Sequence, residues 1–238
     1  MSSSDKELIC VLDFEATCDS EPGLVENEVI EFPSVLIAAG SVISEFQLYV
    51  KPMLTPVLTK FCTELTGITN EVIQTQGVEF PEAFRRHREW LLRETGSTSD
   101  YDLENKVLFV TCGDWDLKSM LPKQQKASDL TPVSYLRVWC NVKVVSGFFW
   151  KFPRGKQPQG MTDMLTRLDL TLEGKHHSGI DDCRNIAKIV LKLISQGCHF
   201  QATARLDSND KLIRLQLQFF SCVFFNRERI NILLTANK

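Results

Sequence analysis

The chain has 238 residues, of which 43% are hydrophobic and 24% are charged, and its formal net charge is −3. This composition is that of a globular protein with room for one domain of about 180–200 residues and an appendage, and the charge argues against a protein that coats long nucleic-acid duplexes. Because there is no long uninterrupted apolar run and residues 1–7 are polar, we expect no membrane partner and no secretory signal, and an intracellular location in the cytoplasm and/or the nucleus.

The first predicted elements are three strands. Residues 8–12 form a short apolar run, which is typical of a central strand buried on both faces. Residues 29–38 and 42–50 are also strand-like, and Gly40-Ser41 between them is the signature of a hairpin. The second and third strands are therefore expected to be antiparallel neighbours.

Helices and further strands follow. Apolar residues at helical spacing predict a helix over residues 80–91. Residues 106–112 and 137–142 predict two more strands, and residues 183–194 predict a long amphipathic helix that Gly197 ends. This order indicates an α/β fold with a mixed sheet flanked by helices. We assign it to residues 7–205, with residues 206–238 as a C-terminal extension.

Acidic residues gather where three of these elements begin or end. Asp13 and Glu15 follow the first strand, and side chains two residues apart in an extended chain point the same way. Asp114 and Asp116 follow the strand over residues 106–112. The third group opens the last helix and contains His176, His177, Asp181 and Asp182. Because ligands of open α/β sheets gather at the carboxyl ends of strands, we expect the three groups to converge.

Converging carboxylates favour a hard divalent cation. Mg²⁺ is held by a few carboxylates together with substrate phosphate oxygens, and two such ions about 3.5–4 Å apart can clamp an in-line phosphoryl displacement. A neutral histidine beside them can take the proton from the attacking water. Zinc is not expected, because the eight cysteines contain no C-x-x-C pair and are better explained as reduced, small hydrophobic residues.

Five short motifs occur in order along the chain. They are Ile9-Cys-Val-Leu-Asp13-Phe-Glu15, Glu28-Val-Ile-Glu31-Phe-Pro33, Leu65-Thr-Gly-Ile-Thr69, Gly113-Asp-Trp-Asp116 and His177-Ser-Gly-Ile-Asp-Asp182. With them the sequence resembles the DEDDh 3′–5′ exonucleases, and among these the enhanced-RNAi and histone-mRNA 3′-end exoribonuclease branch. The resemblance covers residues 7–205. It implies an RNase H-like fold of the proofreading-exonuclease type, two Mg²⁺ or Mn²⁺ ions, and release of 5′-nucleotides from a 3′ hydroxyl end.

The resemblance also implies roles for individual residues. It makes His177 the general base and assigns the metal carboxylates to Asp13, Glu15, Asp116 and Asp182. Two alternatives exist within these motifs. Asp114 lies in the same motif as Asp116, and His176 and Asp181 are separated by four residues, as His177 and Asp182 are. The family pattern favours Asp116, His177 and Asp182. We expect the side chain of His176 to point elsewhere. Since only residues 1–7 precede the first strand, we expect the SAP module of some relatives to be absent, which argues against stem-loop or ribosome-directed binding.

An exonuclease must hold a strand end, and base stacking contributes about 1–3 kcal/mol per base to such binding. Phe14, Ala16 and Thr17 flank the first carboxylates and are expected to line the terminal nucleotide. The resemblance places the segment from Leu65 to Ile68 beside the terminal base. Trp115 either stacks on a base or belongs to the core. Residues 143–156 combine cations with aromatic residues. One interpretation is a helix that buries its aromatic side chains and exposes its lysines. The other, which we favour for Lys151 and Arg154, is contact with the RNA backbone.

The expected substrate is a single-stranded RNA 3′ end, or RNA with a 3′ overhang, in small-RNA or RNA 3′-end processing. A DNA 3′–5′ exonuclease is the alternative, because the metal site acts on the phosphate and only contacts with the 2′-OH distinguish RNA. A catalytically silent RNA-binding module is disfavoured, since all five metal and base positions are filled. Three interpretations of residues 206–238 stay open: a segment that binds a protein adaptor, a basic extension for RNA and a poorly ordered end.

Overall fold

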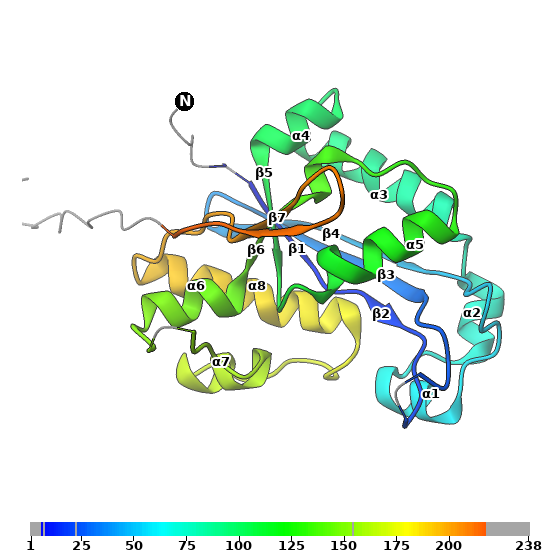
Figure 1. Ribbon diagram of the computed structural model, residues 1–238. Coiled ribbons are helices and arrows are strands. Elements are labelled where there is room, and N and C mark those ends of the chain that lie inside the picture. Colours follow the sequence, from blue (N-terminus) through cyan, green and yellow to red (C-terminus); the bar gives the residue numbers. More distant parts are fainter. Residues whose placement is uncertain (1–5, 7, 22, 154, 218–238) are drawn as a thin grey trace, which may run out of the picture.

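A mixed sheet of eight strands runs through the computed structural model, which describes residues 6, 8–21, 23–153 and 155–217 (Figure 1). Its strands are β1 (Leu8–Leu12), β2 (Glu15–Ala16), β3 (Val29–Ala38), β4 (Ser41–Tyr49), β5 (Val107–Thr111), β6 (Val138–Asn141), β7 (Ala204–Leu206) and β8 (Leu212–Arg214). The order is β2-β3-β1-β5-β6-β7-β8, and β4 pairs with the other edge of β3. Strands β1, β5 and β6 are parallel, while the other pairings are antiparallel.

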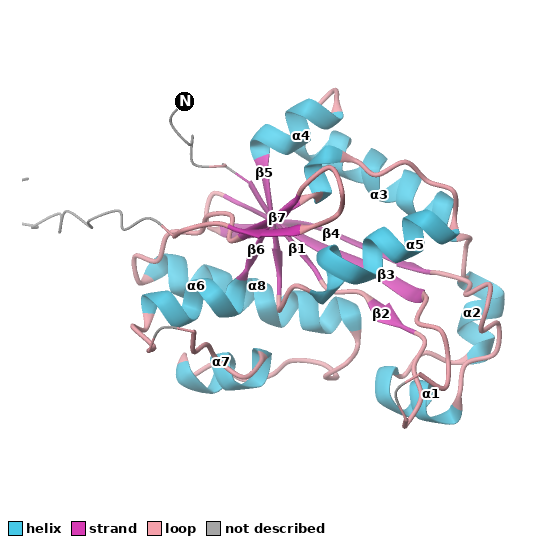
Figure 2. Ribbon diagram, in the orientation of Figure 1, coloured by secondary structure: helices cyan, strands magenta, loops and turns pink. Residues whose placement is uncertain are grey.

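Helices cover both faces of the sheet (Figure 2). They are α1 (Lys60–Thr66), α2 (Asn70–Gln76), α3 (Phe80–Thr95), α4 (Asp100–Lys106), the π-helix η1 (Asp116–Met120), α5 (Leu121–Ala127), the 3₁₀ helix η2 (Ser134–Leu136), α6 (Val142–Phe149), α7 (Met161–Arg167) and α8 (Gly179–Ser195). Helices α3, α4 and α5 lie on one face, and α6, α7 and α8 lie on the other. This is the expected RNase H-like arrangement of a mixed sheet flanked by helices.

The two faces of β1 explain why its sequence is apolar throughout. Cys10 and Leu12 point into the core beneath α3 and α5, whereas Val11 points into the core beneath α8. Neighbouring β5 alternates in the same way, with Phe109 on one side and Val110 on the other. The prediction that residues 8–12 form a central strand buried on both faces is therefore confirmed.

The other predicted elements are present with shifted ends. The hairpin turns at Ala39 and Gly40, both at positive φ, and joins β3 to β4 as antiparallel neighbours. Helix α3 contains the predicted residues 80–91 and ends before Gly96, which has φ 59°. Helix α8 begins at Gly179, four residues before the predicted start, and Gly197 lies just beyond its end. The boundary drawn between residues 205 and 206 falls inside β7, and β8 pairs with β7, so the sheet continues to Arg214.

Two further properties hold for the described part of the chain. No helix there has both the length and the hydropathy that a membrane crossing requires. The cysteines at positions 10, 18, 62, 112, 140 and 183 are free thiols, and most of them are buried, as expected for small hydrophobic residues.

Candidate active site

The first two acids of the site lie just after the C-terminal end of β1. Asp13 directly follows β1, and Glu15 begins β2, which pairs with β3 so that Glu15 lies opposite Glu31. The extended backbone turns both side chains toward the same region. Glu15 is 9% exposed, so its carboxylate is largely removed from bulk water.

Asp116 joins this pair from the neighbouring strand. It opens η1 after a loop that follows β5, and its Oδ1 accepts a hydrogen bond of 2.9 Å from the backbone N–H of Phe14, between the first two acids. Asp114 lies elsewhere: its Oδ1 accepts from Trp139 Nε1 at 3.0 Å, and its Oδ2 pairs with Arg214 at 2.6 Å. The carboxylates of Asp114 and Asp116 therefore have different surroundings, and the assignment of the metal ligand to Asp116 stays a prediction.

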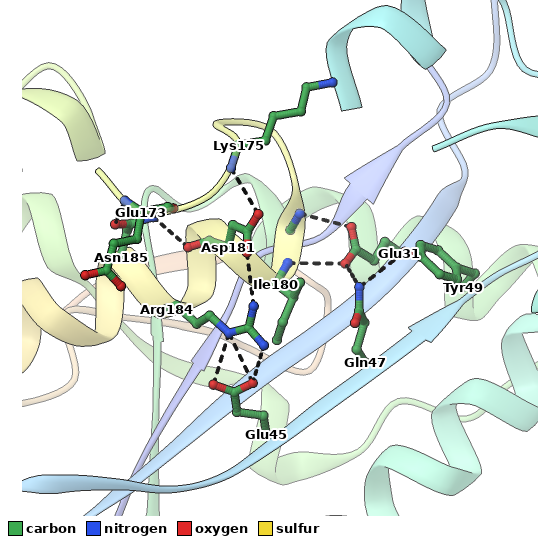
Figure 3. A network of polar contacts seen from close by, with 11 residues as sticks. Glu31, Glu45, Gln47, Tyr49, Glu173, Lys175, Ile180, Asp181, Arg184 and Asn185 are labelled. Atoms are coloured by element: carbon green, nitrogen blue, oxygen red, sulfur yellow. Dashed lines mark hydrogen bonds and ion pairs between the residues drawn. The ribbon is translucent and has the colours of Figure 1, made fainter. Parts of the chain in front are cut away.

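The start of α8 contributes the fourth acid. Asp182 is 4% exposed, and its Oδ2 accepts from the backbone N–H of His177 at 3.0 Å. Asp181 points the other way, where it accepts from Lys175 N at 3.0 Å and pairs with Arg184 at 3.0 Å (Figure 3). Of the two adjacent acids, Asp182 is thus the one that faces Asp13 and Glu15.

The carboxylates of the cluster lie close to one another. One oxygen each of Asp13, Glu15 and Asp182 lies within 4.8 Å of the others. Burial, reinforced by the neighbouring carboxylates, raises the pKa of Glu15 to about 9 and holds the pKa of Asp13 well above its usual range. Burial likewise raises the pKa of Asp116 and of Asp182 to about 6.

One atom of this cluster has no hydrogen-bond partner. Asp182 Oδ1 is buried and unpaired within the described residues. A buried carboxylate oxygen without a partner is unusual and indicates a ligand atom for a group that arrives later. The oxygen-only, strongly negative donor set fits Mg²⁺ or Mn²⁺.

The two histidines lie together beside the cluster. Their rings stack with centroids 4.0 Å apart, and His176 Nε2 lies 3.9 Å from Asp182 Oδ2. The expectation that His176 points elsewhere is therefore wrong: the turn that puts His177 at φ 67° places both rings on the same side. Burial, with smaller effects from His176 and Lys175, lowers the pKa of His177. His177 is thus neutral in the physiological range and able to accept a proton.

Of the three residues expected to line the terminal nucleotide, two are buried and one is half-buried. The ring of Phe14 is 5% exposed and packs edge-on against Phe32 at 4.8 Å, so it belongs to the core rather than to the lining of the site. Thr17 is 1% exposed, and its hydroxyl donates to Glu26 O at 2.6 Å and accepts from Glu28 N at 2.8 Å, so it closes a loop. Ala16 is half-buried at the site.

The other substrate candidates differ in their exposure. Leu65 is half-buried at the end of α1, and Ile68 is buried in the small core beneath α1 and α2. Trp115 is 45% exposed next to Asp116, which decides against the core interpretation. Lys151 is exposed just after α6, while Arg154 lies outside the described residues.

One interpretation of the sequence is a helix over residues 143–156 that buries its aromatic side chains, and two of these side chains are half-buried just beyond α6. Trp150 and Phe152 lie 6.2 Å apart and are half-buried after the helix end. The guanidinium of Arg167 lies over both rings, at 5.8 Å and 4.9 Å. These rings are therefore occupied by a cation of the chain itself.

Sequence reasoning missed the residues that hold the loop before α8. Asn185 donates to Glu173 O at 2.7 Å and to Asp181 O at 2.8 Å, and Lys175 Nζ donates to Glu64 O at 3.0 Å, which joins this loop to α1. Glu31 accepts from the first backbone N–H groups of α8 (Figure 3). The available signal for Glu31 was an acid inside an apolar strand sequence without a nearby basic residue.

Comparisons with known proteins agree with this geometry. Residues 10–190 match the model of the RNase_T family, described as Exonuclease, and the chain belongs to this family. Its relatives include ERI1 exoribonuclease 3 of Homo sapiens, 41% identical over 198 residues, and 3'-5' exoribonuclease 1 of Homo sapiens, 33% identical over 204 residues. These matches cover 82% and 84% of this chain but 56% of each relative, so the chain spans about half the length of these relatives.

Solved structures extend the similarity to the fold. A 3′-exonuclease in a structure described as 3′-end specific recognition of histone mRNA stem-loop superimposes with a TM-score of 0.80 at 30% identity, covering 90% of this chain and 92% of that one. The nuclease domain of 3'hExo, a DEDDh family member bound to rAMP, gives a TM-score of 0.77 at 32% identity, with coverages of 86% and 100%. The chain is therefore a DEDDh-type exonuclease domain, a class that depends on divalent metal ions.

Proposed function

We propose that this chain is a two-metal 3′–5′ exoribonuclease that removes 5′-nucleotides from the 3′ end of RNA. The observation that carries the proposal is the cluster of Asp13, Glu15 and Asp182, whose oxygens approach one another while one buried oxygen of Asp182 has no partner. The similarity to relatives named exoribonucleases supports RNA as the substrate.

The cluster gives each residue a distinct task. Asp13, Glu15, Asp116 and Asp182 would hold Mg²⁺, or Mn²⁺ in its place. When bound, the two ions would polarise the scissile phosphate and lower the pKa of the attacking water. His177 would accept the proton of that water, since its lowered pKa keeps the imidazole neutral near physiological pH.

Residues around the cluster would hold the strand end. The half-buried Leu65 and the exposed Trp115 offer apolar surface to the last bases, and the exposed Lys151 offers a cation to the backbone. We infer that the substrate is a single-stranded 3′ end or a 3′ overhang, met in the cytoplasm and/or the nucleus. A protein adaptor that binds residues 206–238 would select the RNA.

One experiment tests both the reaction and the substrate. RNA with a 3′ overhang and a DNA of the same sequence are labelled at the 5′ end, and their shortening is followed with Mg²⁺, with Ca²⁺ and with EDTA. We expect stepwise shortening of RNA in Mg²⁺ only, because Ca²⁺ takes longer bonds and more ligands and so misplaces water and phosphate. Undiminished cleavage in EDTA would exclude the metal mechanism, and faster cleavage of DNA would replace the exoribonuclease with a DNA exonuclease.

A further inference from the structure

Helix α8 begins without a side-chain cap of its own. Its N-cap residue is Ser178, whose side chain makes no capping hydrogen bond. The first N–H groups of a helix have no partner inside the helix and must find one elsewhere. In α8 the partner comes from another part of the fold.

Glu31 on β3 accepts the hydrogen bonds of the first N–H groups of α8. Its Oε2 accepts from Gly179 N at 3.0 Å, and its Oε1 accepts from Ile180 N at 3.2 Å, across almost 150 residues of sequence. The carboxylate is 1% exposed, and a negative group at a helix N-terminus is favoured by the helix dipole. The start of α8 is therefore bound to the sheet.

The contact at this point leaves no free space. A Cβ on Gly179 would lie 2.8 Å from Pro33 Cγ and 2.9 Å from the carbonyl oxygen of Asp13. The first turn of α8 thus rests directly on Asp13, the residue that follows β1. Any movement of this turn changes the distance between Asp13 and the acids of α8.

We propose that Glu31 is a positioning residue that holds Asp182 and His177 against Asp13 and Glu15 through the first turn of α8. The inference rests on the proposed function. Asp182 lies one turn beyond Gly179, and its Oδ2 accepts from His177 N at 3.0 Å, so both groups follow the placement of that turn. Glu31 acts through the backbone of the helix and not on the substrate.

The oxygens of Glu31 are already committed. Besides the two helix N–H groups, Gln47 Nε2 donates to Oε1 at 2.8 Å from β4 (Figure 3). Three donors therefore surround the carboxylate, and it is absent from the sets of residues whose ligand atoms converge. This arrangement distinguishes Glu31 from a further metal ligand.

The pair of Glu31 and Gln47 allows a sharp test. In Glu31→Gln, one carbonyl oxygen replaces two acceptors, and the new NH₂ group meets an N–H donor. In the double variant Glu31→Gln/Gln47→Glu, the amide of residue 31 donates to the carboxylate of residue 47, and its carbonyl still accepts from Gly179 N, so that only Ile180 N loses its acceptor. The swap keeps the total charge and restores two of the three contacts.

Glu28→Gln is the matched control. Glu28 is 3% exposed and accepts three backbone N–H groups, from Met53, Leu54 and Thr55, at 2.7–2.8 Å. It precedes the same strand but holds a surface loop and not α8. The same substitution there measures the general effect of removing a buried carboxylate.

The readout is Mn²⁺ affinity by titration calorimetry without RNA, together with hydrogen exchange of the Gly179 and Ile180 amides. We expect Glu31→Gln to weaken Mn²⁺ binding about 10–100-fold, the usual effect of losing a group that orients metal ligands. The swap should recover part of this loss, and Glu28→Gln should bind Mn²⁺ as the wild type does.

Three results would overturn the proposal: unchanged Mn²⁺ affinity in Glu31→Gln, an equal loss in Glu28→Gln, or a swap that restores protection of the Gly179 amide without any recovery of Mn²⁺ binding. The last result would make Glu31 a ligand. A wild type that binds no Mn²⁺ would instead contradict the proposed function. In that case, faster exchange of the two amides in Glu31→Gln and recovery of the Gly179 amide in the swap would still support Glu31 as the anchor of α8, whereas unchanged exchange would refute it.

Discussion

Buried acids occur in two settings in this molecule. Glu28 and Glu31, at the beginning of β3, each accept three N–H groups. Asp13, Glu15 and Asp182 face one another, and one oxygen of Asp182 has no partner within the described residues. An acid surrounded by donors is already stabilised and serves the fold, whereas acids that face one another are stabilised only when a proton or a cation binds.

The largest effect that this comparison predicts is that of Asp13→Asn. Losing one oxygen ligand should reduce RNA hydrolysis by far more than the roughly 10–100-fold that loss of an orienting partner causes. The metal-free variant should nevertheless melt at a higher temperature than the wild type, because one of several mutually repelling charges is gone. Hydrolysis and thermal melting in EDTA measure the two effects. A variant that is inactive because it has become less stable would contradict the comparison.

His177→Ala should have the next largest effect. Removal of a general base lowers the rate by about 10²–10⁴-fold, while the carboxylates still bind the metal. Because the pKa of His177 is lowered, the wild-type rate should rise with pH through a group that titrates below the usual histidine range, and this rise should be missing in the variant.

His176→Ala is the control for that experiment. His176 stacks on His177, and such a contact is worth about 0.5–1.5 kcal/mol, so we expect a loss of at most about tenfold with the pH dependence retained. Equal losses in both variants would indicate damage to the loop. A large loss in His176→Ala alone would make His176 the base.

Glu28→Gln should affect stability and leave the chemistry intact. With one acceptor fewer for three backbone N–H groups, the free energy of unfolding should fall by about 1–3 kcal/mol. Denaturant unfolding and the rate of RNA hydrolysis at saturating Mg²⁺ give the two values. A fall in the rate without a fall in stability would mean that Glu28 also serves the reaction.

A smaller effect should appear in the pH dependence of stability. Folding raises the pKa of Asp116 and Asp182 to about 6 and that of Glu15 to about 9. The contribution of these groups to stability is therefore complete below their unfolded pKa values of about 4, and it is lost as the pH rises to about 6 for the two aspartates and to about 9 for Glu15. In EDTA, the melting temperature of the wild type relative to Asp13→Asn should fall over this range. Saturating Mg²⁺ should remove the difference in slope, and a slope of opposite sign would show that the acids are not crowded.

Sequence alone predicted the elements that carry their own periodic signal. Strands β1 and β5 are continuous apolar segments, and α3 and α8 are long enough to show an apolar face. The seven-residue helices α1, α2 and α4 were not predicted. Their N-cap residues are Thr59, Thr69 and Ser99, whose side chains accept hydrogen bonds from the first turn, so their starts are marked by a single capping contact and not by a periodic pattern.

The convergence of the acids could also be predicted, because element ends meet at one edge of the sheet. The direction of individual side chains could not. The chain turns within residues 13–17, which sends Phe14 into the core and the hydroxyl of Thr17 into a loop, and neither outcome follows from neighbouring residue types. The role of Glu31 depends on a contact with a helix that begins almost 150 residues later.

The π-helix η1 makes the number of residues before α5 as important as their identity. Leu121 N donates to Asp116 O, five residues back, so this turn holds one residue more than an α-turn would. Deleting one residue between Leu117 and Met120 would let α5 continue backward as a regular α-helix and would rotate Asp116 by about 100° about the helix axis. Its carboxylate would then lose Phe14 N and leave the other acids. A deletion that removes no acidic residue should therefore inactivate the protein as thoroughly as a substitution of Asp116, and a compensating insertion within the same turn should restore it.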